Sequence, residues 1–289
     1  MKQKIVFFGS SNYVIPVIEI IKKNFDFSLV ITTEQNPSDP IPHFCIKNKI
    51  KYISVTSLNN SIVNGQLSMV NCQFAVLANF GLIIPKKVLK IFPKGIINIH
   101  PSLLPKYRGP TPVQTAILNG ERVTGVTLTK LDDKVDHGPI LAQQKEKIDG
   151  DDTADLLYKK LFKIGADFLY QNIKQYIKGD LKPVPQNHSK ATFTKALTKK
   201  DGYFDINNPP SPVKIDRMIR AYYPWPGVWT KLQIVRGSTR GVEAQKIIKF
   251  LPEQIIQVEG KKPMSYKDFI NGYSEGGKEL LRKIGLISN

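Results

Sequence analysis

The first half of the chain alternates short apolar runs with longer stretches of helical length. The runs cover residues 4–8, 27–32, 74–78 and 95–99, and a helix is predicted over 13–23. Uninterrupted apolar runs of this length are typical of strands that are buried on both faces, as in a parallel sheet. The repeated strand–helix order therefore predicts an α/β fold with a doubly wound, Rossmann-like parallel sheet.

The pattern changes after residue 133. Residues 140–148 predict a further strand, and residues 153–177 predict a long amphipathic helix because apolar positions recur at helical spacing. We expect the inner side of this helix to carry Leu156, Leu157, Leu161, Ile164, Phe168, Ile173 and Ile177.

The C-terminal part has a different texture. A short helix is predicted over 212–221, a Tyr-Pro-Trp-Pro-Gly turn follows at 223–227, and β-like runs cover 228–235, 244–251 and 254–259. These features predict a small β-rich, OB-like domain, although the strands are few for a closed barrel.

The length of the chain also favours two domains. With 289 residues it exceeds one typical small domain, and a Pro-containing segment lies between the two patterns. We predict a first domain over 1–182, a linker over 183–204 and a C-terminal domain over 205–289.

The charge of the chain is strongly positive. The formal net charge is +18 with a pI near 9.7, and both residues 1–200 and residues 201–289 carry an excess of Lys and Arg. Such a balance favours a polyanionic partner, with RNA ahead of DNA or a membrane surface. A composition bias shared by the whole genome is the alternative explanation.

Cysteine content and the N-terminus indicate the compartment. Cys45 and Cys72 are the only cysteines, and their spacing fits neither a disulfide framework nor a zinc site. The N-terminal sequence MKQKIVFFGSS lacks the features of a signal peptide, and no apolar run is long enough to span a bilayer. We expect a cytoplasmic protein that does not enter the membrane.

The fourth apolar run carries candidate chemistry. Alternate residues of a strand share a face, so Asn98 and His100 project together, and Pro101 ends the strand directly after them. Open α/β sheets hold their ligands at the carboxyl ends of the strands. Asp136, in a loop restrained by Gly138 and Pro139, is the candidate carboxylate, while Asp132 and Asp133 compete for the same role.

These residues resemble a known family, the folate-dependent formyltransferases. The resemblance covers about residues 1–180 and lies in pieces of characteristic order: Asn98-Ile-His100-Pro-Ser102-Leu103-Leu104-Pro105, Arg108-Gly-Pro-Thr-Pro112, Gly125-Val-Thr127 and Asp136-x-Gly138. The resemblance implies that Asn98, His100 and Asp136 are catalytic. It also implies that Ser102, Leu103, Leu104 and Pro105 lie against the folate, and that Phe80, Leu82 and Ile83 form walls of the pterin pocket, with core packing as the alternative for these three.

The chemistry of formyl transfer agrees with these residue types. Transfer from 10-formyltetrahydrofolate to an amine passes through a tetrahedral intermediate whose oxygen gains negative charge. The Asn98 amide and a protonated His100 can donate hydrogen bonds to that oxygen. Asp136 can orient His100 and help to remove the proton of the amine. No metal is needed for this reaction.

The C-terminal part points to the acceptor. The stretches 193–205, 217–227 and 259–265 resemble the second domain of those family members that act on initiator methionyl-tRNA, in translation initiation. The net charge favours the same acceptor. The segment 33–40, however, is short and not basic where tRNA-acting members have a longer basic loop. A nucleotide-linked amino sugar therefore stays open as the alternative acceptor, with the same folate donor.

A tRNA acceptor would require a basic surface next to the catalytic residues. The candidate side chains for phosphate binding are Lys195, Lys199, Lys200, Arg217, Arg220, Lys231, Arg236 and Arg240.

Overall fold

The computed structural model describes residues 3–34, 38–59, 61–234 and 244–287. The chain divides into two compact units. The first contains Met1–Pro112, Val123–Lys147 and Tyr158–Lys195, and the second contains Val113–Arg122, Ile148–Leu157 and Ala196–Asn289. The predicted domain boundaries at residues 182 and 205 remain a prediction.

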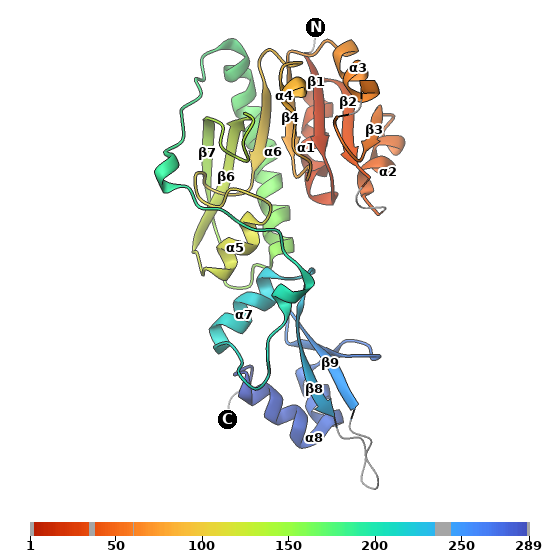
Figure 1. Ribbon diagram of the computed structural model, residues 1–289, viewed down its shortest axis with the longest axis vertical. Helices are drawn as coiled ribbons and strands as arrows, with labels where there is room; N and C mark the ends of the chain where they lie inside the picture. Colours follow the sequence, from red (N-terminus) through yellow and green to blue (C-terminus); the bar gives the residue numbers. More distant parts are fainter. Residues whose placement is uncertain (1–2, 35–37, 60, 235–243, 288–289) are drawn as a thin grey trace. The chain divides into compact units, whose positions relative to one another are not determined.

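A seven-stranded sheet with the order β3-β2-β1-β4-β5-β6-β7 forms the centre of the first unit (Figure 1). Strands β1 to β5 run parallel to one another, and β6 and β7 continue the sheet as antiparallel strands. The strands are β1 (Lys4–Gly9), β2 (Asp26–Thr33), β3 (Tyr52–Val55), β4 (Phe74–Ala78), β5 (Ile96–His100), β6 (Val123–Lys130) and β7 (Ile140–Lys147).

Helices cover both faces of this sheet, as expected for a doubly wound fold. One face of the sheet packs its apolar side chains, among them Val6 and Phe8, against Leu67 of α3 and Val88 of α4. On the opposite face Gly165 of α6 lies against Ile99 and Val126, and its lack of a side chain permits this close approach. The helices up to residue 178 are α1 (Ile15–Asn24), α2 (Pro40–Lys47), α3 (Ser61–Met69), α4 (Lys86–Leu89), α5 (Pro112–Leu118) and α6 (Ala154–Lys178), with a 3-10 turn at Asn12–Val14.

The second unit contains an antiparallel four-stranded sheet with the order β11-β10-β9-β8. Its strands are β8 (Val228–Ile234), β9 (Ala244–Leu251), β10 (Ile255–Val258) and β11 (Met264–Ser265). The helices α7 (Pro212–Ala221) and α8 (Tyr266–Lys283) belong to this unit, together with α5 from Val113 onward. Ile248 and Phe250 of β9 are buried on the inner face, whereas Lys249 is exposed on the outer face. The expected small β-rich domain is confirmed.

The predicted fold class is confirmed, with differences at single elements. The predictions for 74–78, 212–221 and 244–251 coincide with β4, α7 and β9, whereas β3 and β6 were not predicted. Leu156 is 51% exposed and was wrongly placed on the inner side of α6, because the buried positions at the start of this helix are Ala154, Leu157 and Tyr158. Residue 235, Arg236 and Arg240 lie outside the described residues. Within the described part of the chain, no helix combines the length and hydrophobicity that crossing a bilayer requires.

Candidate active site

A cavity of about 580 Å³ opens at the carboxyl edge of the first sheet. Its lining comes from the ends of β4 and β5, from the loops after β4, β5 and β6, and from α6. The sheet order changes direction between β1 and β4, and doubly wound sheets hold ligands in the crevice at such a point. The position of this cavity therefore marks it as the candidate active site.

Asn98 and His100 project into this cavity from the last residues of β5. Both side chains are buried. His100 Nε2 lies 3.0 Å from the carbonyl oxygen of Tyr107, which can only accept, so the ring donates a hydrogen there. This contact fixes the orientation of the ring, so that Nδ1 lies on the side of Asp136.

Asp136 completes the cluster. Its carboxylate accepts hydrogen bonds from Asn98 Nδ2 at 3.1 Å and from the backbone N–H of Gly109 at 2.8 Å, and it lies 3.5 Å from His100 Nδ1. The backbone of Asp136 is left-handed, with φ of 45°. The structure thus brings together the amide, the imidazole and the carboxylate that the sequence nominated.

The two competing aspartates have other partners. Asp132 Oδ2 lies 2.6 Å from His137 Nδ1, and Asp133 forms an ion pair with Lys86 at 2.8 Å. The hydrogen bond and charge of Lys86 hold the pKa of the Asp133 carboxyl below its usual range. Asp136 is consequently the aspartate that faces Asn98 and His100. The described residues contain no group of three or more His, Cys, Asp or Glu side chains suited to a metal ion.

The loop after β5 is held by Thr127 of β6. The Thr127 hydroxyl donates to Ser102 O at 2.6 Å and accepts from Leu104 N at 3.1 Å. Gln143 Nε2 donates both to Leu104 O and to Thr127 Oγ1. The peptide bond between Leu104 and Pro105 is cis. The Gly-Val-Thr element of the sequence therefore fixes the backbone that follows His100.

The nominated folate-contacting residues separate into two groups. Phe80, Leu82 and Ile83 line the cavity, and Ile83 is 78% exposed at its mouth. Ser102, Leu103, Leu104 and Pro105 do not line it; Ser102 and Leu104 are buried, and Ser102 Oγ donates to Lys106 O. Contact between folate and these four residues stays a prediction.

Sequence reasoning missed a polar network behind Asp136. The buried Arg108 guanidinium donates to Gln186 Oε1 at 2.6 Å and to His188 Nδ1 at 2.8 Å. Desolvation, and then the neighbouring His137 and Arg108, lower the pKa of His188, which suits an imidazole that accepts from Arg108. The His188 ring stacks on His137 at 4.0 Å. Nothing in the polar segment around Gln186 signals that one of its side chains is buried.

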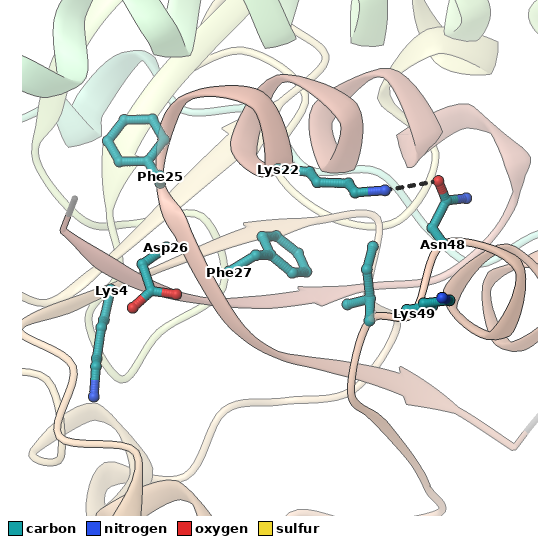
Figure 2. Close-up of a pocket in the computed structure, with 8 residues that line it drawn as sticks. Lys4, Lys22, Phe25, Asp26, Phe27, Asn48 and Lys49 are labelled. Atoms are coloured by element: carbon teal, nitrogen blue, oxygen red, sulfur yellow. Dashed lines mark hydrogen bonds between the residues drawn. The ribbon is translucent and has the colours of Figure 1, made fainter.

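A second cavity, of about 480 Å³, lies at the amino edge of the same sheet. Figure 2 shows its side chains, which come from the starts of β1 and β2 and from the ends of α1 and α2. Lys22 Nζ donates to Asn48 Oδ1 at 2.9 Å, while Lys4, Lys49 and Asp26 complete the charged lining. It contains neither a histidine nor a paired catalytic group.

The nominated basic side chains differ in what they contact. Arg220 pairs with Asp216 at 2.9 Å and also donates to Asp152 O, so it has a structural role in the second unit. Arg217 packs against Gly120. Lys231 is exposed on the outer face of β8, and its neighbour on that face, Trp229, packs against Tyr203 at 4.8 Å.

Comparison with known proteins identifies the family. A family model described as formyl transferase matches residues 4–173, which include all of the clustered side chains. The chain belongs to the formyltransferase family. A methionyl-tRNA formyltransferase of Roseiflexus castenholzii is 33% identical over 313 residues, covering 97% of this chain and 99% of the relative. A second one, from Roseiflexus sp. strain RS-1, is 37% identical over 258 residues, covering 86% and 78%.

Solved structures share the formyltransferase fold. An N-formyltransferase of Helicobacter canadensis, in complex with folinic acid and dTDP-3-aminofucose, aligns with a TM-score of 0.58 at 22% identity. The match covers 89% of this formyltransferase and 94% of that chain. At this identity the likeness concerns the fold.

Proposed function

We propose that this formyltransferase transfers the formyl group of 10-formyltetrahydrofolate to the amino group of initiator methionyl-tRNA. One observation carries the catalytic part of the proposal: Asn98, His100 and Asp136 converge at the carboxyl edge of the sheet, where contacts with one another and with backbone groups hold them. Relatives that match nearly the whole chain and are named methionyl-tRNA formyltransferases support the acceptor.

Asn98 and His100 stabilise the charge that develops on the formyl oxygen. Asn98 Nδ2 carries two hydrogens and gives one to Asp136, so the other can donate to the substrate. His100 Nδ1, only loosely engaged with Asp136 at 3.5 Å, donates to the same oxygen when the ring is protonated. Preorganised donors of this kind contribute about 3–4 kcal/mol each to lowering the barrier.

Asp136 handles the proton of the attacking amine. The new carbon–nitrogen bond forms while the nitrogen loses a proton, and the bond between the formyl carbon and N10 of the folate then breaks as N10 gains one. The Asp136 carboxylate, whose side chain is 13% exposed, accepts the proton of the amine and returns it to N10 through the water-accessible mouth or through His100.

The folate lies against the apolar wall of the cavity. Phe80, Leu82 and Ile83 supply this wall, and the exposure of Ile83 leaves an apolar surface free to pack on a ring. We propose that Ser102, Leu103, Leu104 and Pro105 contribute through their backbone, which Thr127 and Gln143 hold in place.

The outer face of β8 and β9 suits an RNA backbone. Lys231 and Lys249 are exposed there beside Trp229 and Tyr203, and basic groups next to aromatic rings are typical of RNA-binding surfaces. The net charge of +18 favours the same class of acceptor. We assign the protein to translation initiation in the cytoplasm.

A nucleotide-linked amino sugar is the second candidate acceptor. The short, non-basic segment at 33–40 favours it, because little positive charge stands there to bind an RNA. In the structure Asp39 of this segment accepts from Thr32 Oγ1 at 2.7 Å and from Ser11 N at 3.1 Å, so its carboxylate is used internally.

A competition assay decides between the two acceptors. The protein is incubated with 10-formyltetrahydrofolate, methionyl-initiator tRNA and a set of amino-sugar nucleotides in one mixture, and each amine is assayed for formyl transfer. We expect formyl-methionyl-tRNA as the main product. Formylation of an amino sugar with none of the tRNA would overturn the proposal.

A further inference from the structure

The segment that follows α6 belongs to the first unit, which contains the candidate active site. Residues 184–195, called the strap below, bridge to Ile140 through Val184 and to Arg108 through Phe193. Arg108 N donates to Thr192 O at 2.9 Å, and Thr194 N donates to Arg108 O at 2.7 Å. The strap thus contacts both the segment at Arg108, which precedes Gly109, and the start of β7 at Ile140, which follows the loop of Asp136.

Gln186 is the anchor of the strap. All residues from 182 to 201 are described, and within this range Gln186, at 5% exposed, is the buried one. A buried amide must satisfy its donors and its acceptor. Gln186 Nε2 donates to Asp136 O at 2.9 Å and to Gly138 O at 2.7 Å, while Oε1 accepts from the Arg108 guanidinium.

The partners fix the orientation of this amide. A guanidinium can only donate and the two carbonyls can only accept, so Oε1 must face Arg108 and Nε2 must face the loop of Asp136. Gln186 therefore joins the segment that supplies the Gly109 N–H to the loop that supplies the carboxylate.

The loop needs such a support because Asp136 is backbone-strained. A non-glycine residue at φ of 45° costs roughly 1–2 kcal/mol, and the surrounding structure must maintain it. The Gln186 amide holds the carbonyl of Asp136 itself and the carbonyl two residues further on. This contact sets the direction in which the carboxylate leaves the backbone.

We propose that Gln186 is a positioning residue that acts through Asp136. The proposal rests on the proposed function, in which Asp136 is the catalytic carboxylate. Gln186 does not line the cavity, so it affects the reaction by aiming that carboxylate at Asn98, His100 and the attacking amine. A displacement of about 1 Å in a catalytic group can lower a rate about a hundredfold.

Gln186→Glu is the sharpest test, because it retains an acceptor for Arg108 and removes both donors to the loop. We expect kcat for formyl transfer to fall about tenfold to a hundredfold, with KM for the folate donor changed less than about threefold. Asn187→Asp is the matched control: it makes the same amide-to-carboxylate change at the adjacent, exposed position and should leave kcat unchanged.

A double-mutant cycle separates positioning from general support of the fold. In an Asp136→Ala background Gln186→Glu should lower the single-turnover rate less than about twofold, because the group that it aims is gone. Gln186→Met, neutral and of similar length, should show the same dependence if the charged variant is too unstable to assay. Thermal melting of each variant confirms that it is folded.

Two results would overturn the proposal: a kcat for Gln186→Glu within twofold of the parent protein, or an equal loss in both backgrounds. Failure of the proposed function would look different from these two results. Either the Asp136→Ala variant would keep full activity, or the parent protein would formylate neither acceptor. Either of those outcomes would remove the carboxylate that Gln186 is proposed to aim, and the proposal with it.

Discussion

The two edges of the first sheet carry cavities of similar size and opposite character. At the carboxyl edge, in about 580 Å³, an amide, an imidazole and a carboxylate are tied to one another and to backbone groups. At the amino edge, in about 480 Å³, lysines and Asp26 stand around Phe25 and Phe27, and Lys22 bonds to Asn48 (Figure 2).

The important difference between the two cavities is how firmly their side chains are held, and not which has more charge. The amino-edge cavity has more positive charge, but its lysines are long side chains, which are costly in entropy to hold in one geometry. At the carboxyl edge, Asn98 and His100 are buried at the end of a strand and have their rotamers set by hydrogen bonds. Chemistry that stabilises a transition state needs groups that are already in place, which supports our proposal that the carboxyl-edge cavity is the catalytic one.

The largest contrast between the edges should appear in the rate of formyl transfer. Asn98→Ala and His100→Ala should each lower kcat at least about a hundredfold, because each removes a donor to the developing charge. Lys22→Ala at the amino edge should leave kcat within twofold. Steady-state kinetics on folded variants measure both; a comparable loss in Lys22→Ala would abolish the distinction.

The second-largest contrast between the two edges should appear in folate binding. A non-hydrolysable folate analogue at a hundredfold excess over its Kd should stabilise the native protein by about 2.7 kcal/mol, visible as a rise in Tm. Ile83→Ser should shrink this rise with little effect on the unliganded Tm, because Ile83 is exposed. An undiminished rise in Ile83→Ser, or a rise that is lost in Lys22→Ala, would place the folate elsewhere.

The loop after β5 can be loosened by a substitution at Thr127. Thr127→Val keeps the shape of the side chain but leaves Ser102 O and Leu104 N without their partner. Unpaired buried groups of this kind cost about 1–3 kcal/mol each, so urea unfolding should show a clear loss of stability. A free energy of unfolding equal to that of the parent protein would mean that this loop is held by other contacts.

The salt dependence of tRNA binding tests the second unit. Replacing Lys231 and Lys249 with Ala should reduce the slope of log K against log salt by about 1 for each phosphate that the protein no longer neutralises, without changing folate binding. The matched control replaces two lysines at the amino edge of the first sheet, Lys22 and Lys49, with Ala. An unchanged slope in the first pair would remove the outer face of β8 and β9 from the interface.

The smallest expected effect concerns a buried thiol. Burial, and then the Asp39 carboxylate, raise the pKa of Cys45 to about 11. The thiol is therefore protonated at pH 8 and should react with a disulfide reagent only slowly, and faster once the protein is unfolded. Rapid reaction of native Cys45, measured in a Cys72→Ser variant, would contradict this burial.

The sequence was informative where pattern and chemistry coincide. The apolar run predicted the strand, and Asn98 and His100, the polar residues near its end, lie at the cavity as expected for the end of a buried parallel strand. Spacing alone left Asp132, Asp133 and Asp136 open, and the resemblance to the formyltransferases selected Asp136. Leu156 was misplaced because two leucines stand side by side at 156 and 157, and only Leu157 shares the buried side of the helix with Ala154 and Leu161. Strands β3 and β6 are short or mixed in polarity, so neither stands out as an apolar run.

Gln186 marks the limit of reasoning along the sequence. Its burial depends on three partners that lie 48 to 78 positions away in the chain, and no local pattern predicts such a contact. The segment around it is polar and Pro-containing, which is typical of a linker. The tertiary structure makes it part of the scaffold of the site instead.

The central claim is that Asp136, held at the carboxyl edge, is the catalytic carboxylate for formyl transfer to methionyl-tRNA. Single-turnover mixing of excess enzyme with methionyl-initiator tRNA and 10-formyltetrahydrofolate tests it most directly. Asp136→Ala should form formyl-methionyl-tRNA at least about a hundredfold more slowly than the parent protein while keeping its melting transition. A folded Asp136→Ala protein with a near-normal rate would contradict the claim and redirect attention to Asp133.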